Sequence, residues 1–321
     1  MHRFVLSVVV LATIAIADAR ACINEYGTSI SGTAQLRSGG PRRHVPVSIP
    51  IDRDHYRKQV ASLSPRLADS PSHQELSDLA VAYLYLGEPG RAIELLVQAE
   101  SQRPNEYVIA SNLGTAYELA GRNVEALKWI EEGIRLNSGS HEGSEWIHAN
   151  LLRAKIEMAD DPEWIRSNSV TGLHFGNGPI PDFDVSLSRP NCPESPEVIA
   201  LHLEHQLVER RKFIPGPDPI VASLMFDLAN ATVLSETVED AMPIYLAARD
   251  LGYHDSALLD KRIVALKNLR RGNLLSGWTY DSIAACAIGS AIVLGIGVWR
   301  ARRRMRSKNT TNQGMHTEAS A

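Results

Sequence analysis

The sequence predicts an all-α protein: a solenoid of stacked helix pairs with an irregular inserted segment and one C-terminal transmembrane helix. Three observations predict this class. The chain is 44% hydrophobic but only 6% aromatic, and it is rich in alanine and leucine, which favours helices over a β-sandwich. A pattern of small and large side chains recurs with a period of 34 residues between residues 73 and 140. A charge-free apolar run at 282–299 stands outside these repeats.

Length and composition exclude several classes of protein. A chain of 321 residues with this apolar content is too hydrophobic to be disordered, and it is long enough for one large or two modest domains. Its 3 cysteines are too few for a disulfide-stapled mini-domain or a multi-cysteine zinc protein. The net charge of -4 provides no electrostatic footprint for nucleic acid, so we expect no nucleic-acid partner.

The first 72 residues divide into a signal peptide (1–21) and an N-terminal arm with a lead-in helix (22–72). An apolar run follows Arg3 and ends at Ala17, which is typical of a signal-peptide core and too short to span a membrane. Small residues in A-x-A spacing follow the run and offer cleavage sites. Beyond a glycine-rich loop, the pattern from Asp54 to Leu67 predicts the lead-in helix.

Two repeat units occupy residues 73–140. Nine positions match in kind at a shift of 34: Leu76, Leu79, Ala80, Tyr83, Gly87, Ala92, Leu96, Ala99 and Pro104 in the first unit, and Ala110, Leu113, Gly114, Tyr117, Gly121, Ala126, Ile130, Gly133 and Ser138 in the second. Small residues are expected where paired helices cross, because a larger side chain would hold them apart. Gly87 and Gly121 are placed to end the first helix of each unit in the left-handed conformation. Ser72 and Glu75 form a capping-box sequence at the start.

These features resemble the tetratricopeptide repeat, a helix–turn–helix unit of 34 residues. The run from Asn112 to Tyr117 is especially similar to the family pattern. The resemblance implies a solenoid whose first helices line a concave, peptide-binding surface. The sequence contains no C-x-x-C, no phosphate-binding glycine loop, no G-x-S-x-G elbow and no H-E-x-x-H, so we expect a non-catalytic protein that needs no cofactor.

Past the repeats, the pattern decays and then returns. Residues 141–221 read as degenerate helices around an irregular loop segment, with short strands near 170–175. Residues 222–271 read as a divergent unit followed by a capping helix, because Ala241 and its neighbours match the repeat offsets.

The candidate binding residues are those that the repeat offsets direct into the groove. They are Gln74, Ser77, Val81 and Tyr85 in the first unit and Ser111, Asn112, Thr115 and Glu118 in the second. Some repeat domains hold a peptide carboxylate with paired Lys and Arg at these offsets, but serine, threonine and glutamate stand here. An anionic peptide end is therefore an unexpected ligand. Asn112 can bond a peptide backbone, although the family also uses asparagine there for structural reasons.

Two histidine clusters and one cysteine pair leave alternatives open. His202, His205 and Glu209 share one helix face and are weak zinc candidates; the alternative is an interfacial helix with Arg210 as a surface charge. His141 and His148 lie on one face beside Glu145 and Trp146, either as a ligand site or as a packed join. Cys22 and Cys192 can pair in an oxidising compartment, but nothing places them within bonding range.

The C-terminal region predicts a membrane anchor (282–299) and a basic cytoplasmic tail (300–321). Trp278, Tyr280 and Trp299 flank the apolar run, and arginine and lysine are dense just after it, so the positive-inside rule puts the C-terminus in the cytoplasm. The N-terminal domain is then extracytoplasmic, periplasmic if the protein is bacterial. Small-xxx-small pairs in the span allow a homodimer.

We therefore expect a single-pass membrane protein that presents a non-catalytic protein-interaction scaffold in a bacterial envelope. Its partner is a protein or peptide of unknown identity. Two alternatives stay open. One is a metal-dependent enzyme that uses His202, His205 and Glu209, and the other is a structural subunit of a membrane complex with no free groove.

Overall fold

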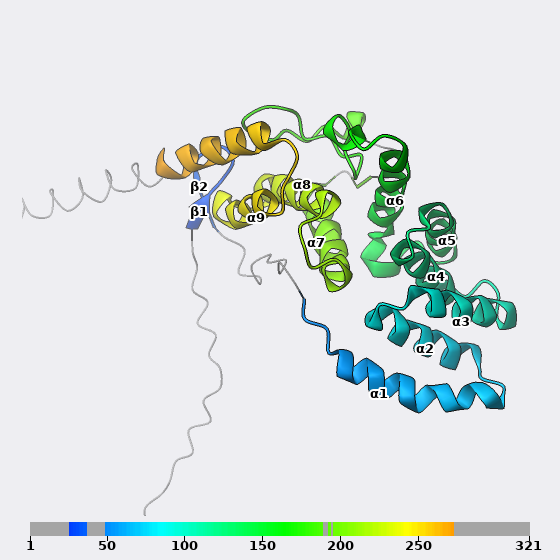
Figure 1. The fold of residues 1–321 in the computed structure, drawn as a ribbon. Coiled ribbons are helices and arrows are strands. Elements are labelled where there is room, and N and C mark those ends of the chain that lie inside the picture. The colour runs from blue at the N-terminus through cyan, green and yellow to red at the C-terminus, as the bar shows by residue number, and fades with distance from the viewer. Residues whose placement is uncertain (1–25, 37–48, 189–191, 194, 273–321) are drawn as a thin grey trace, which may run out of the picture.

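The computed structural model describes residues 26–36, 49–188, 192–193 and 195–272. Two short strands come first and are followed by helices: β1 Tyr26–Thr28, β2 Ala34–Leu36, α1 Arg53–Leu63, α2 His73–Leu86, α3 Pro89–Gln102, α4 Tyr107–Leu119, α5 Asn123–Leu136, α6 Glu145–Asp160, α7 Pro196–Phe213, α8 Pro219–Ser235 and α9 Val238–Asp250. Residues 256–272 are also helical. Figure 1 shows α1–α6 stacked in an arc, with α7–α9 leading from α6 toward the strands β1 and β2.

The predicted signal peptide (1–21) and transmembrane helix (282–299) lie outside the described residues. Within the described ranges, none of the helices combines the length and the hydropathy that a membrane crossing needs.

Helices α2–α5 form the repeat array. Helices α2 and α4 begin at His73 and Tyr107, and α3 and α5 begin at Pro89 and Asn123, so each pair of starts is separated by the period seen in the sequence. The Ser72–Glu75 capping box is present. Gly87 and Gly121 adopt φ of 83° and 76° at the ends of α2 and α4, which confirms the predicted left-handed caps. The prediction of a helical-repeat array is confirmed by these four helices.

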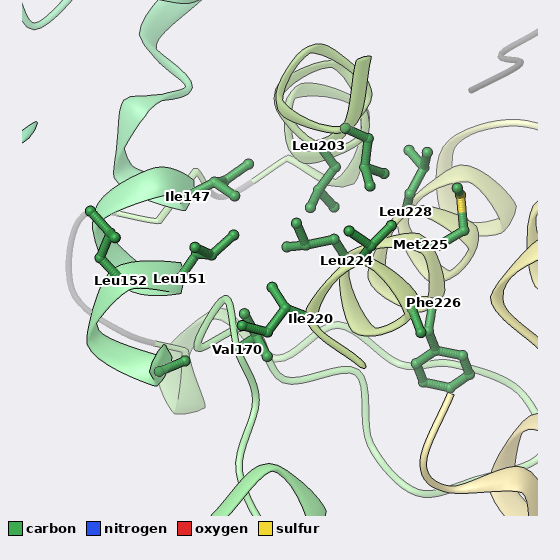
Figure 2. Packing of buried hydrophobic residues seen from close by; sticks show 14 of the residues in the cluster. Ile147, Leu151, Leu152, Val170, Leu203, Ile220, Leu224, Met225, Phe226 and Leu228 are labelled. Atoms are coloured by element: carbon green, nitrogen blue, oxygen red, sulfur yellow. The ribbon is translucent and has the colours of Figure 1, made fainter. Parts of the chain in front are cut away.

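Helices α6–α9 share a continuous core with the array. Figure 2 shows Leu151 of α6, Leu203 of α7 and Leu224 of α8 among the side chains of one apolar cluster, and Val170 of the following loop lies there as well. Burying such side chains is the main favourable term in folding. The second half therefore packs as an extension of the array.

A β-hairpin at the N-terminus departs from the all-α prediction. Strands β1 and β2 pair antiparallel with Tyr26 opposite Leu36. The backbone N–H of Thr28 donates to Oε2 of Glu239 on α9 at 2.6 Å, so the hairpin docks far along the chain. A Cβ on Gly27 would lie 2.8 Å from Thr237 Cβ, and only glycine lets the strand approach this closely.

One predicted helix boundary and one predicted strand region were also wrong. Helix α1 ends at Leu63 and not at Leu67, because Pro65 cannot continue the α-helical hydrogen bonds and a 3₁₀ turn follows from Ser64 to Asp69. Residues 170–175 contain no strand. Buried side chains, and not a neighbouring strand, satisfy backbone groups of this segment. For example, Asn150 Nδ2 donates to the Thr171 carbonyl at 2.7 Å.

Two glycines of the array should respond oppositely to alanine. A Cβ on Gly114 would lie 2.6 Å from Cγ1 and 3.2 Å from the backbone nitrogen of Ile130, which is itself buried, whereas a Cβ on Gly133 would meet nothing closer than 3.8 Å. We expect Gly114→Ala to lower the free energy of unfolding by about 1–3 kcal/mol through overpacking. Gly133→Ala should raise it by about 0.5–1 kcal/mol through helix propensity. Urea unfolding of the full-length chain measures both; similar effects of the two changes would contradict this packing.

Candidate functional site

The strongest candidate site is a pocket of about 320 Å³ between α2, α4, α6 and α7. Its walls combine apolar side chains with a polar floor. The lining residues are Val81, Leu84, Tyr85, Tyr107, Val108, Ser111, Asn112, Thr115, Glu118, Leu119, His141, Glu145, His148, Gln206, Glu209, Arg210, Phe213 and Ile214. We call this space the groove pocket. Its volume suits one or two side chains of an extended segment.

The structure brings most of the sequence-predicted groove residues together. Six of the eight line the pocket: Val81, Tyr85, Ser111, Asn112, Thr115 and Glu118. Gln74 is exposed about two helical turns before Val81 and does not line the pocket. Ser77 is buried beneath the floor, where its Oγ accepts a hydrogen bond from Asn112 Nδ2 at 3.2 Å. Asn112 therefore joins α4 to α2 and lines the pocket at once.

An aromatic stack forms one wall of the groove pocket. The ring of Tyr85 lies between Tyr56 of α1 and Phe213 of α7, with centroid distances of 4.3 Å and 5.1 Å. Burial raises the pKa of Tyr85 to about 12, and Tyr56 and Glu209 add to the shift, so its hydroxyl stays neutral. This wall joins the first helix, the array and the second half.

Glu118 sits at the back of the pocket in a buried ion cluster. Its side chain is 6% exposed and accepts from His148 Nε2 at 2.7 Å and from Lys155 Nζ at 2.6 Å. The two terminal nitrogens of Arg210 donate to its two oxygens at 2.8 Å and 3.1 Å. Burial works to raise the pKa of Glu118, but Arg210, His148 and Lys155 outweigh it and hold that pKa well below its usual range.

Glu145 extends the cluster toward the pocket mouth. It pairs with His141 Nδ1, and its other oxygen lies 3.5 Å from His148 Nδ1. Burial alone would raise the pKa of Glu145, yet the two histidines lower it to about 2. Hydrogen bonding to Glu145 raises the pKa of His141, and bonds to both carboxylates raise that of His148 against the effect of burial. The His141–His148 face is thus a packed join that also lines a pocket.

Arg210 and Phe213 are two of the pocket-lining residues that the sequence analysis did not predict. Arg210 was expected to be a surface charge, but its side chain is 8% exposed because α7 packs its basic end against Glu118. The sequence signal is their spacing, since residues three apart share a helix face. The repeat offsets assign only the first helix of each unit to the groove, so they do not include α7.

The weak metal candidates make other contacts. His202 Nδ1 accepts from Trp146 Nε1 at 3.0 Å, the His205 ring lies 5.2 Å from that of His141, and Glu209 pairs with Lys212 at 2.7 Å. Across the described part of the chain, no three His, Cys, Asp or Glu side chains gather as a metal site would need. Cys192 packs against the core, while Cys22 lies outside the described residues, so their pairing stays a prediction.

Comparison with known proteins adds little to this description. No protein-family model matches the chain, and no curated protein matches it. A solved structure titled "Crystal structure of APC/C hetero-tetramer Cut9-Hcn1" is similar over 67% of this chain and 46% of that chain, with 10% identity and a TM-score of 0.30. The aligned region is thus less than half of that chain. The helical-repeat assignment therefore rests on the spacing of α2–α5 and not on this likeness.

The ion cluster predicts a particular pH dependence of stability. Because the folded-state pKa of His148 is raised, its contribution is full below about pH 6.5 and is lost as the pH rises through the folded value. The lowered pKa of Glu145 acts at the other end, where its contribution falls from about pH 4.3 toward pH 2. We expect the free energy of unfolding to fall as the pH rises above about 6.5, and to fall less in His148→Gln. Urea unfolding of both proteins at each pH measures the difference; parallel pH profiles would contradict a charged His148 in the fold.

Proposed function

We propose that the protein is a non-catalytic scaffold that holds an extended segment of a partner protein in the groove pocket. The carrying observation is that the pocket is formed and open among the described residues, with apolar walls beside a hydrogen-bonding floor. Ser111, Asn112 and Thr115 supply the floor, and Tyr85 and Phe213 form part of the wall. Sites of this composition bury an apolar side chain and orient it with a few polar groups.

The charges of the pocket support a neutral, apolar anchor on the partner. Glu118 is fully engaged by Arg210, His148 and Lys155, and Glu145 is engaged by the two histidines. Both carboxylates are therefore already paired within the chain. Little negative charge is left to attract a basic segment of a partner. Arg210 is likewise engaged, so it does not replace the missing carboxylate clamp. Hydrophobic burial is then the main source of affinity.

We further propose that a membrane anchor presents this scaffold outside the cytoplasm. The support is the apolar run 282–299, its flanking aromatics and the basic stretch after it. The signal-peptide pattern at 1–21 supports the same orientation.

The groove proposal predicts a site-specific crosslink. Val108 is 54% exposed and lines the groove pocket, whereas Val124 is 66% exposed on α5 and does not line it. A photoactivatable phenylalanine analogue at position 108 should crosslink to a partner in native membranes, and the same residue at 124 should not. The substitution Val108→Asp should reduce partner capture and Val124→Asp should not, because only the first puts an unpaired charge at the pocket. Equal crosslinking at both positions would count against the groove.

The orientation proposal makes a separate prediction. Protease added to intact cells with a permeabilised outer envelope should digest the 26–272 region, and a reporter fused after Lys308 should be active only in the cytoplasm. The positive-inside rule is the physical reason. A protected scaffold combined with an external reporter would invert the topology while leaving the groove untouched.

A further inference from the structure

The helix at 256–272 is packed against the end of the solenoid on one side. Arg262 of this helix is buried and donates to the Phe175 carbonyl at 2.8 Å. Leu269 approaches the β-hairpin, since a Cβ on Gly32 would lie 3.4 Å from its Cδ2. Figure 1 shows this helix in orange beside β1, β2 and α9. The described residues leave its opposite side uncovered.

The uncovered side becomes basic toward the C-terminal end of the helix. Val264, Lys267, Asn268 and Arg271 are exposed there, and spacings of three, four and seven residues put them on one face. We call these four residues the basic face. Lys267 and Arg271 make no hydrogen bond or ion pair with any described residue. The nearest acidic residue on this side of the helix is Asp260, one turn before Val264.

Arg270 has the same charge but points to the packed side of the helix. Its Nε lies 3.5 Å from Oε1 of Glu239 on α9, the carboxylate that also accepts from Thr28 of the hairpin. Arg270 is therefore balanced by a carboxylate of the fold, and the adjacent Arg271 is not. The charge of the basic face is thus available to a partner outside the described residues.

The sequence around the basic face makes this charge unusual for the chain. The whole chain has a net charge of -4, yet residues 261–280 contain no Asp or Glu. The basic residues in that stretch are Lys261, Arg262, Lys267, Arg270 and Arg271. A positive surface on an otherwise acidic chain favours a negatively charged partner.

The apolar run at 282–299 brings one class of anionic partner within reach. Its first residue is ten positions beyond residue 272, and ten residues span at most about 36 Å in any conformation. With this run in a bilayer, the basic face lies within that distance of the lipid headgroups. The tether makes the contact intramolecular, so that a weak attraction is sufficient.

We propose that the basic face rests on the headgroups of anionic phospholipids, an inference that depends on the membrane anchor proposed above. Lys267 and Arg271 bind phosphate oxygens, and Val264 adds an apolar contact at the interface. Figure 1 places this helix and α1–α3 at opposite ends of the described chain. The lipid contact therefore holds α2, which lines the groove pocket, away from the membrane and accessible to a partner.

Lipid photocrosslinking of the full-length chain tests the contact. The chain is reconstituted in vesicles of phosphatidylcholine alone or mixed with phosphatidylglycerol, with a photoactivatable phenylalanine analogue at position 264. We expect lipid adducts to be at least about fivefold more abundant in the anionic vesicles, because each basic residue near such a surface contributes about that factor. Adducts should decrease as salt screens the charges. The same analogue at position 124, exposed on α5, should give few adducts in either vesicle.

The two adjacent arginines provide a matched pair of variants. Arg271→Gln removes one charge from the basic face and should reduce the lipid adducts at position 264 about fivefold. Arg270→Gln removes the same charge from the side that faces Glu239 and should leave the adducts within about twofold. Both arginines are exposed, and thermal midpoints check that both variants stay folded.

The outcomes separate this proposal from the membrane anchor. Release of the chain from vesicles by alkaline carbonate would overturn the anchor and this contact with it. A retained chain with equal adducts at position 264 in both kinds of vesicle would overturn the lipid contact alone, as would equal losses in Arg270→Gln and Arg271→Gln. Protein adducts without lipid adducts in native membranes would also overturn it, because the basic face would then bind an acidic protein.

Discussion

The two halves of the solenoid depend on one buried carboxylate. Glu118 lies on α4, within the repeat array, yet its ion-pair partners come from α6 and α7. Taking a carboxylate out of water is costly, and only several well-placed donors recover that cost. Three donors do so here, and removing the acceptor would leave Arg210 and Lys155 charged with no carboxylate. Breaking such a pair typically costs about 3–5 kcal/mol, which makes Glu118 a specific requirement for the docking of α7.

The groove pocket exists because of that docking. In a plain repeat array the first helices would face open solvent, but here α7 crosses opposite them and turns the concave face into a pocket. The same helix contributes Phe213 to the aromatic stack with Tyr85. A disturbance at Glu118 should therefore reach the pocket through the position of α7. Helix α7 thus takes part in both the ion cluster, through Arg210, and the apolar wall, through Phe213.

Sequence periodicity predicted the helices of the repeat array well. It did not predict how α7 and the β-hairpin pack against the rest of the chain. Small residues such as Gly114 recur because paired helices must approach closely, and this constraint is local enough to read along the chain. The hydrogen bond between Thr28 of the β-hairpin and Glu239, by contrast, joins residues that are 211 positions apart in the sequence. No local sequence pattern encodes such a contact. Groove residues on α2 and α4 were found from their offsets, whereas Arg210 looked like any exposed arginine. When helices that are far apart in the sequence build a pocket, its lining residues can be identified only from the packed structure.

Buried arginines, together with apolar contacts, place the irregular parts of this fold. Arg210 binds a carboxylate through both terminal nitrogens, Arg211 donates to the carbonyls of Pro215 and Gly216, and Arg262 donates to carbonyls of the loop at 175–178. A planar guanidinium offers five donors in a fixed fork and stays charged when buried, which a lysine ammonium does not match. Each arginine thus satisfies several carbonyl or carboxylate oxygens that no helix or sheet would satisfy. A segment without regular structure can then be held in place, as the loop at 175–178 is held by Arg262.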